Sequence, residues 1–197
     1  MNLIFATHNQ HKVDEISGLL PADWKVLTLA QAGITDEIPE PHNTLEENAR
    51  EKARVIYELR QTACFSEDTG LEVASLNGEP GVRSARYAGE ERSNERNMEL
   101  LLRNLEGKKE RSARFRTVIC LLLDGKEYLF EGICPGRIME SPRGTKGFGY
   151  DPLFVPDGAD RSFAEMSREE KSAYSHRAKA VEGLVIFLSN LRTNEQY

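Results

Sequence analysis

The chain has 197 residues, a formal net charge of −6 and 39% hydrophobic residues. A chain of this length buries about 70% of its unfolded surface on folding, so we expect a substantial core in one domain or two closely joined lobes. The negative charge excludes general binding to nucleic-acid backbones, which needs dense lysine and arginine. We interpret the short basic run at residues 108–116 as a solvated helix end and strand start.

The cysteines and the first residues of the chain indicate a reducing, cytoplasmic environment. Cys64, Cys120 and Cys134 are an odd number at wide spacings, which is typical of buried free thiols in a reducing environment. Residues 1–7 lack the length and the basic flank of a signal peptide, and no run of about 18 apolar residues occurs. We therefore expect a cytoplasmic protein with no membrane partner.

In the N-terminal half, hydrophobic periodicity predicts strands alternating with helices. Buried strands are expected over 3–6 and 25–29, with a helix over 11–20 between them, which is a βαβ-like start. Thr44 and Glu47 form a capping box that opens a second helix, and we expect Lys52 on its polar face. The expected apolar face of this helix is Leu45, Ala49, Ala53, Ile56 and Leu59.

A strand over 63–66 and a turn at 78–81 come next, and then a helix capped by Ser93 with Met98, Leu101, Leu102 and Leu105 inward. The apolar run 115–123, the hairpin signal Asp124-Gly125 and the return over 128–134 predict an antiparallel pair. A glycine-proline loop over 141–149 and a second capping box at Ser167 precede the last helix. Its apolar stripe is Val181, Leu184, Leu188 and Leu191.

Polar residues after the first strand form the first candidate site. A strand that feeds a helix N-terminus presents backbone N–H groups to an anion, and Lys12 would lie in the first helical turn. Together with hydroxyl and amide groups these donors match a polyphosphate, although no glycine-rich phosphate-loop pattern is present. No further His or Cys supports zinc binding, and an ordinary polar loop is the alternative. The candidate residues are Thr7, His8, Asn9, Gln10, His11 and Lys12.

Acidic residues form the second candidate site. Glu67 and Asp68 follow the strand predicted over 63–66, and Glu40 lies in a proline-bordered loop. Mg²⁺ prefers hard oxygen ligands and keeps several waters, so one or two carboxylates beside a phosphate site suffice. The alternative is that these acids are surface residues.

The third candidate site is typical of a nucleobase pocket. Phe148 stands between two glycines, so its ring could stack on a purine, which is worth about 1–3 kcal/mol. Lys171 and Arg177 only donate hydrogen bonds, so they favour an oxo group over an amino group on the ring, and His176 could bind there too. The alternatives are an aromatic residue that plugs the core and a structural histidine.

In order along nearly the whole chain, these motifs resemble the inosine triphosphate pyrophosphatase family. The resemblance implies hydrolysis of ITP, dITP and XTP to the monophosphate and pyrophosphate with Mg²⁺, which removes deaminated purines from the nucleotide pool. It also implies an elongated α/β fold with a long mixed sheet, a single domain over 1–197 with two lobes around a central cleft, and a homodimer. The motifs are Thr7–Lys12, Glu67–Leu71, Pro80–Tyr87, Gly147–Pro152 and Ser175–Arg177.

By position, the resemblance assigns Thr7 to Lys12 and Lys52 to the triphosphate, and Glu40 and Asp68 to the metal, with Asp68 also the proton acceptor. Its remaining substrate-binding positions are Thr69, Phe148, Gly149, Tyr150, Asp151, Lys171, His176 and Arg177. Many members have Asp-Asp-Ser-Gly in place of residues 67–70 and glycine in place of Lys146. The first departure leaves open which acid holds the metal, and the second adds a cation near the base loop.

Two alternatives stay open at this point. A nucleotide pyrophosphatase of the Maf type would share the chemistry but not Phe148 or the 175–177 motif. A non-catalytic nucleotide- or RNA-binding protein would not need Glu40, Asp68 and Lys12 together. Release of pyrophosphate from ITP distinguishes an enzyme from a binding protein.

Overall fold

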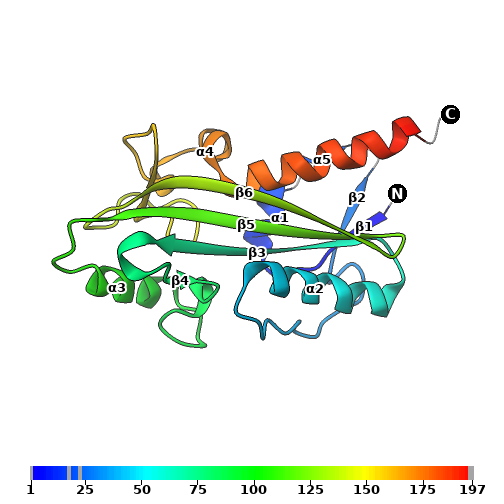
Figure 1. Cartoon of the computed structure of the whole chain (residues 1–197), viewed down its shortest axis with the longest axis horizontal. Coiled ribbons are helices and arrows are strands. Elements are labelled where there is room, and N and C mark those ends of the chain that lie inside the picture. Colours follow the sequence, from blue (N-terminus) through cyan, green and yellow to red (C-terminus); the bar gives the residue numbers. More distant parts are fainter. Residues whose placement is uncertain (1, 17–18, 22–23, 195–197) are drawn as a thin grey trace. The chain divides into compact units, whose positions relative to one another are not determined.

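The computed structural model describes residues 2–16, 19–21 and 24–194 (Figure 1). The chain divides into two compact units: unit 1 comprises residues 1–68, 117–132 and 177–197, and unit 2 comprises residues 69–116 and 133–176. Strands β3 (Cys64–Val73), β5 (Ser112–Leu123) and β6 (Lys126–Ile138) each continue from one unit into the other. Within the described residues, no helix is long and apolar enough to cross a membrane.

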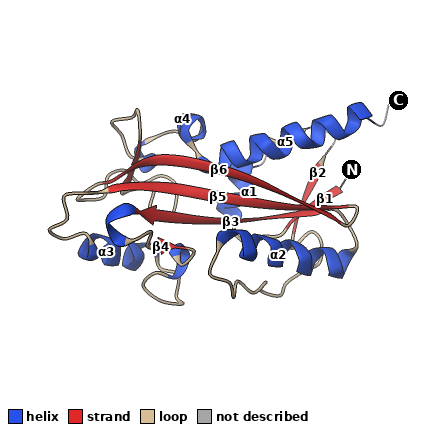
Figure 2. Ribbon diagram, viewed as in Figure 1, coloured by secondary structure: helices blue, strands red, loops and turns tan. Residues whose placement is uncertain are grey.

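The strands, drawn in red in Figure 2, form one mixed sheet. Their order is β2-β1-β3-β5-β6-β7, with β4 paired to β3. The short strands are β1 (Asn2–Phe5), β2 (Lys25–Thr28), β4 (Pro80–Gly81) and β7 (Phe154–Pro156). Strand β1 runs parallel to β2 and β3, whereas β4 is antiparallel to β3 and β7 to β6. This arrangement confirms the predicted α/β class with a mixed sheet.

The predicted hairpin joins β5 to β6. Asp124 and Gly125 have φ of 50° and 72°, and a two-residue turn with positive φ at both positions matches the twist of the flanking strands. Both strands extend beyond the range that their apolar patterns predict.

Unit 1 places helices on both faces of β1. The helices are α1 (Gln10–Ile16), α2 (Leu45–Arg60) and α5 (His176–Asn194), with α2 and α5 on opposite sides of the sheet (Figure 1). Leu3 and Phe5 pack in one cluster with Leu184 of α5, while Ile4 packs in another with Ile56 of α2. Because successive side chains of a strand point to opposite faces, β1 is covered on both faces and reads as a continuous apolar run.

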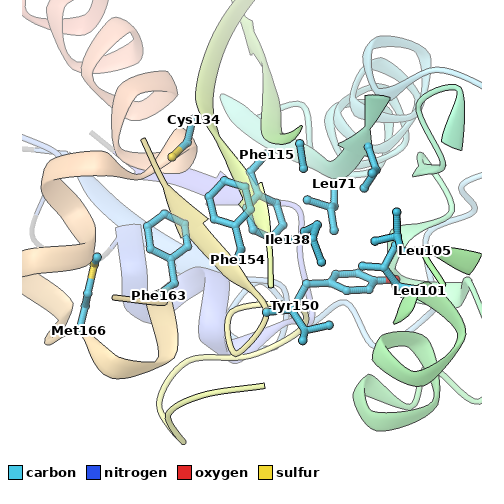
Figure 3. Packing of buried hydrophobic residues seen from close by; sticks show 13 residues of the cluster. Leu71, Leu101, Leu105, Phe115, Cys134, Ile138, Tyr150, Phe154, Phe163 and Met166 are labelled. Atoms are coloured by element: carbon cyan, nitrogen blue, oxygen red, sulfur yellow. The ribbon is translucent and has the colours of Figure 1, made fainter. Parts of the chain in front are cut away.

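Unit 2 has its own core (Figure 3). Helices α3 (Asn94–Asn104) and α4 (Arg168–Tyr174) belong to it, with short 3-10 helices at Ala74–Leu76, Ser84–Arg86 and Phe163–Glu165. Phe115 lies edge-on to Phe154, with ring centroids 4.7 Å apart. The buried members of this core are Leu71, Val73, Leu101, Leu105, Ala113, Phe115, Cys134, Ile138, Tyr150, Leu153, Phe154, Phe163 and Met166.

The helix starts follow the sequence signals closely. Thr44, Ser93 and Ser167 each accept a hydrogen bond from the backbone N–H three residues on, so all three predicted caps are confirmed. Ser167 and Glu170 form the full capping box, whereas the box predicted at Thr44 and Glu47 is incomplete, because the Glu47 carboxylate accepts from the Thr44 hydroxyl. The helix predicted over 11–20 is wrong at its end: α1 stops at Ile16, residues 17–18 lie outside the described residues, and 19–20 form a turn and a bend.

Two further predictions are wrong in ways that affect the site. Strand β3 does not end at Ser66 but continues to Val73, because it exchanges its parallel partner β1, paired up to Phe65, for the antiparallel β4 at Leu71 and Glu72. On α2, Leu59 is 62% exposed, whereas Lys52 is only 5% exposed and shares the buried side with Ile56.

Candidate active site

Glu67 is the centre of a buried charge cluster in unit 1, which we call the Glu67 cluster. Arg177 donates from Nε to Oε2 at 2.7 Å and from Nη2 to Oε1 at 2.9 Å, and Lys12 Nζ lies 2.9 Å from Oε1. Arg177 also donates to Glu15. Burial alone would raise the pKa of Glu67, but the charges of Arg177 and Lys12 outweigh it and hold this pKa well below its usual value. Glu67 is therefore ionised and held by Arg177 and Lys12.

Asp68 belongs to a second cluster of unit 1, the Asp68 cluster. Lys52 Nζ lies 2.9 Å from Asp68 Oδ1 and 2.7 Å from Glu40 Oε1. Burial lowers the pKa of Lys52, but Asp68 and Glu40 more than offset this effect, so the pKa is raised and the ammonium stays charged. The pKa of Asp68 is raised, because burial and the charge of Glu40 outweigh the attraction of Lys52 and Lys12.

The two adjacent carboxylates thus have pKa values shifted in opposite directions. Glu67 is held as an anion by two cations, whereas the environment of Asp68 favours uptake of a proton. Pairs of titratable groups separated in this way mark acid–base assignments in active sites. Asp68 is the better proton acceptor of the two.

Asn48 is a member of the Asp68 cluster that sequence reasoning missed. Its Nδ2 lies 3.4 Å from Asp68 Oδ2, its Oδ1 accepts the His42 backbone N–H at 2.9 Å, and the side chain is 1% exposed. Asn48 precedes Lys52 by one helical turn on α2, so both reach the same carboxylate. That spacing was the available signal, but it requires knowing which face of α2 is buried.

The six predicted phosphate residues lie in the loop after β1 and the start of α1. Thr7 Oγ1 accepts the Asn9 N–H at 3.1 Å, and Lys12 is in the first turn of α1, as predicted. Lys12 enters the Glu67 cluster, whereas His8 Nε2 lies 2.9 Å from the Asp36 carbonyl and Gln10 donates to Asp14. His8, Gln10 and His11 are exposed. Phosphate binding by this segment stays a prediction.

Unit 2 contains the predicted base residues, and three of them form one group, the Phe148 loop cluster. Asp151 Oδ2 accepts the Phe148 backbone N–H at 2.9 Å and lies 2.7 Å from Lys171 Nζ. The same ammonium lies 5.2 Å from the centroid of the Phe148 ring and 5.3 Å from that of Phe163. A donor and an acceptor are therefore held side by side next to an aromatic face.

The other predicted base residues lie in different surroundings. His176 is 3% exposed and stacks on Phe115, with centroids 4.7 Å apart. Tyr150 is 4% exposed within the core of unit 2, and Gly149 has φ of 60°. Thr69 follows Asp68 in β3 and is half-buried. Substrate contact by these residues stays a prediction.

Arg177 differs most from its expected surroundings. It is 2% exposed, it belongs to unit 1, and its guanidinium is bound to carboxylates of the Glu67 cluster. Contact with a purine also stays a prediction for Arg177, and its observed bonds favour a role in holding Glu67.

Among residues 2–16, 19–21 and 24–194, no three His, Cys, Asp or Glu side chains are grouped in a way that could hold a metal ion by themselves. Glu40 and Asp68 bind the same ammonium, so their carboxylates lie close together. Two carboxylates with substrate phosphates and waters are an adequate ligand set for Mg²⁺. The chain therefore supplies a partial site of hard oxygen ligands.

The fold and these clusters define a mixed α/β protein with acid–base and ammonium groups suited to a nucleotide. The Ham1 family model matches residues 3–187, and the chain belongs to the Ham1 family. This match confirms the family resemblance that the motifs indicate, and it argues against the Maf type.

Known relatives are similar to this chain in sequence over almost its full length. A dITP/XTP pyrophosphatase of Flavobacterium psychrophilum is 48% identical over 190 residues, covering 96% of this chain and 100% of that protein. One of Bacillus subtilis is 43% identical over 185 residues, covering 92% and 93%. Among solved structures, the Staphylococcus aureus Ham1 protein is 36% identical, with a TM-score of 0.89 and coverage of 96% and 99%.

Proposed function

We propose that this protein hydrolyses dITP, XTP and ITP to the nucleoside monophosphate and pyrophosphate, and so removes deaminated purines from the nucleotide pool. The observation that carries the proposal is the geometry of Glu67 and Asp68, adjacent on β3, with Lys12 Nζ 2.9 Å from Glu67 Oε1 and Lys52 Nζ 2.9 Å from Asp68 Oδ1. Relatives named dITP/XTP pyrophosphatase, matched over nearly the whole chain, support this substrate class.

In the proposed mechanism, Asp68 accepts a proton from water as the water oxygen bonds to phosphorus. The attacked atom is the α-phosphorus. Its bond to the oxygen that bridges to the β-phosphorus breaks, and pyrophosphate leaves with the bonding electrons. Lys12 and Lys52 offset the negative charge that develops on the phosphate oxygens. The neutral hydrogen bond from Asn48 and the charge of Lys52 orient the Asp68 carboxylate for this transfer.

We propose Mg²⁺ as the cofactor, and Glu40 and Asp68 are the residues that would hold it. When bound, the ion would neutralise phosphate charge and orient the triphosphate. The hard oxygen donors of these two residues suit Mg²⁺, whose remaining ligands would be substrate oxygens and water.

The Phe148 loop cluster supports selection of a 6-oxopurine. Hypoxanthine and xanthine present an acceptor at O6 beside a donor at N1–H, which complements the Lys171 donor beside the Asp151 acceptor. Adenine presents the reverse order, a donor at N6 beside an acceptor at N1. We therefore assign Lys171 and Asp151 to discrimination against ATP, whereas exclusion of GTP needs a contact at the 2-amino group.

The proposal includes three further features. Residues 1–197 work as a single catalytic domain, the protein is a homodimer, and it acts in the cytoplasm, where polymerases draw on the nucleotide pool. Cys64, Cys120 and Cys134 form no disulfide bond within the described residues, which fits a reducing compartment. Light scattering on the purified protein tests the dimer.

The experiment that tests the function is an assay of pyrophosphate release from dITP, XTP, ITP, GTP and ATP, with Mg²⁺ and after its removal by a chelator. We expect release from the first three nucleotides, and only with the metal. Tight binding of these nucleotides without release would instead support a binding protein.

A further inference from the structure

The segment Pro80–Tyr87 is one of the motifs that the proposed chemistry does not use. It follows β3 and includes β4 and a 3-10 helix at Ser84–Arg86. All of its partners described below belong to unit 2.

This segment is attached to β3 through Gly81 and Ser84. A Cβ atom added at Gly70 would lie 2.5 Å from the Gly81 carbonyl oxygen, so the backbones of β3 and β4 approach as closely as glycine allows. The Leu71 N–H donates to Ser84 Oγ at 2.8 Å, and Ser84 Oγ donates to the Gly81 carbonyl at 2.5 Å. Ser84 is thereby fixed to the part of β3 that directly follows Asp68.

Helix α3 fixes the same segment from another direction. Asn97, 2% exposed, donates to the carbonyls of Ala85 at 3.0 Å and Ser84 at 3.4 Å, and it accepts the Ala88 N–H at 2.7 Å. One side chain thus satisfies two backbone carbonyls of the segment and the N–H of the residue that follows it. A fully satisfied buried polar network of this kind holds a single backbone arrangement.

The same segment also holds the Phe148 loop, through the carbonyl of Ser84. Tyr150 Oη donates to the Ser84 carbonyl at 2.8 Å, and Figure 3 shows its ring directed toward Leu101 and Leu105 of α3. Burial raises the pKa of Tyr150 above its usual value, so the hydroxyl keeps the proton that it donates. The next residue is Asp151, whose carboxylate accepts the Phe148 N–H and binds Lys171.

We propose that the Tyr150 hydroxyl is a positioning group for base recognition, which fixes the Phe148 loop cluster through the Ser84 carbonyl and Asn97. This inference rests on the proposed function and deepens it. The hydroxyl holds the backbone beside Asp151, and the Asp151 carboxylate in turn sets the positions of Phe148 and Lys171. Because binding sites lose much of their effect when groups move by a fraction of an ångström, a single supporting hydrogen bond has a measurable consequence.

The test is Tyr150→Phe, which keeps the ring in the core and removes only the oxygen. The matched control is Tyr87→Phe, which removes a hydroxyl bonded to Glu79 and Asn104 in the same unit. Two calorimetric probes separate the roles: IMP, which has the base, and tripolyphosphate, which has none. Circular dichroism and thermal unfolding verify that both variants are folded.

We expect Tyr150→Phe to raise the dissociation constant of IMP about tenfold, to leave tripolyphosphate binding unchanged and to lower kcat/KM for ITP chiefly through KM. Tyr87→Phe should bind IMP like the wild type. If the Tyr150 hydroxyl had only a structural role, Tyr150→Phe would change thermal stability and not IMP affinity. Unchanged IMP affinity in the folded variant would therefore overturn this inference and leave the proposed function intact. A wild-type protein that neither binds IMP nor releases pyrophosphate would overturn the proposed function and this inference with it.

Discussion

Asp68 combines a raised pKa with contacts to Lys52 and Asn48, and this combination leads to the first prediction. Asp68→Asn keeps the shape of the side chain and removes its ability to accept a proton. Pyrophosphate release from ITP should fall by at least ~10², the usual size of general-base assistance. The measurement is steady-state turnover of the purified, folded variant.

Glu72→Gln is the matched control, because Glu72 lies on the same strand and pairs with Arg114 outside the Asp68 cluster. It should retain wild-type turnover. If Asp68→Asn turns over ITP as fast as Glu72→Gln, the assignment of the proton acceptor is wrong.

For single residues, the sequence predicts which side chains belong to the candidate site better than it predicts their bonding partners. Lys12 and Asp68 could be selected from their places after predicted strands. The bonding of Arg177 to Glu67 could not, because the two residues are 110 positions apart and only the packing of α5 brings them together. The burial of Lys52 was missed for a related reason: a lysine on an amphipathic helix normally faces solvent, and only buried carboxylates reverse that preference.

At the scale of elements, the loop before Asp151 leads to the second prediction. Gly147 has φ of 75°, and a Cβ atom there would lie 2.0 Å from Asp151 Oδ2. Gly147→Ala should therefore displace the Asp151 carboxylate from Lys171 and weaken IMP binding by at least about tenfold. Calorimetry with IMP is the measurement.

Gly149→Ala is the control for backbone strain. Gly149 has φ of 60°, but a Cβ atom there meets nothing within 4 Å. Both variants share the conformational cost of alanine at positive φ, so only the clash with Asp151 distinguishes them. Equal losses of IMP binding would show that strain alone, and not the Asp151 contact, governs the loop.

The neighbouring strands β3 and β5 lead to a third prediction, on pH. Burial raises the pKa of Cys64 and Cys120 from 9.0 to about 12. A group whose pKa is higher in the folded state contributes stability below its unfolded pKa and loses it as the pH rises toward the folded value. The free energy of unfolding in urea should therefore fall as the pH rises from 9 toward 12.

The Cys64→Ala, Cys120→Ala double variant isolates this effect from lysine and tyrosine titration. Its stability is lower at neutral pH because it creates cavities, but its decline with alkaline pH should be shallower than that of the wild type. Parallel curves for the two proteins would contradict the role of the thiols.

Elements with strong local signals were predictable, and those that depend on partners were not. Caps at Thr44, Ser93 and Ser167 and the Asp124-Gly125 turn are encoded within a few residues. The extent of β3 depends on which strands pair with it, and the short strands β4 and β7 have no apolar pattern long enough to detect. Their existence follows from the sheet that they join.

At the scale of the whole molecule, the two units carry different kinds of candidate group. Unit 1 holds the charged groups that we propose for phosphate binding and acid–base chemistry, in the Glu67 and Asp68 clusters. Unit 2 holds the donor, acceptor and aromatic face of the Phe148 loop cluster. Variants in unit 1 should therefore affect every nucleotide, and variants in unit 2 should affect the choice among them.

The same substitution in each unit makes this division testable, and it is the last prediction. Wild type should prefer ITP to ATP by roughly 10²–10⁴, because adenine leaves a charged donor facing another donor. Lys12→Met removes the ammonium that we propose to contact phosphate, a group that all nucleotides share, so kcat/KM for ITP, XTP, GTP and ATP should fall by a similar factor of about 10–100. Lys171→Met removes the donor that we propose for O6, so ITP and XTP should lose most of their advantage while ATP changes little. A uniform loss from Lys171→Met, or an altered ratio of ITP to ATP from Lys12→Met, would contradict the assignment of base selection to unit 2 and phosphate binding to unit 1.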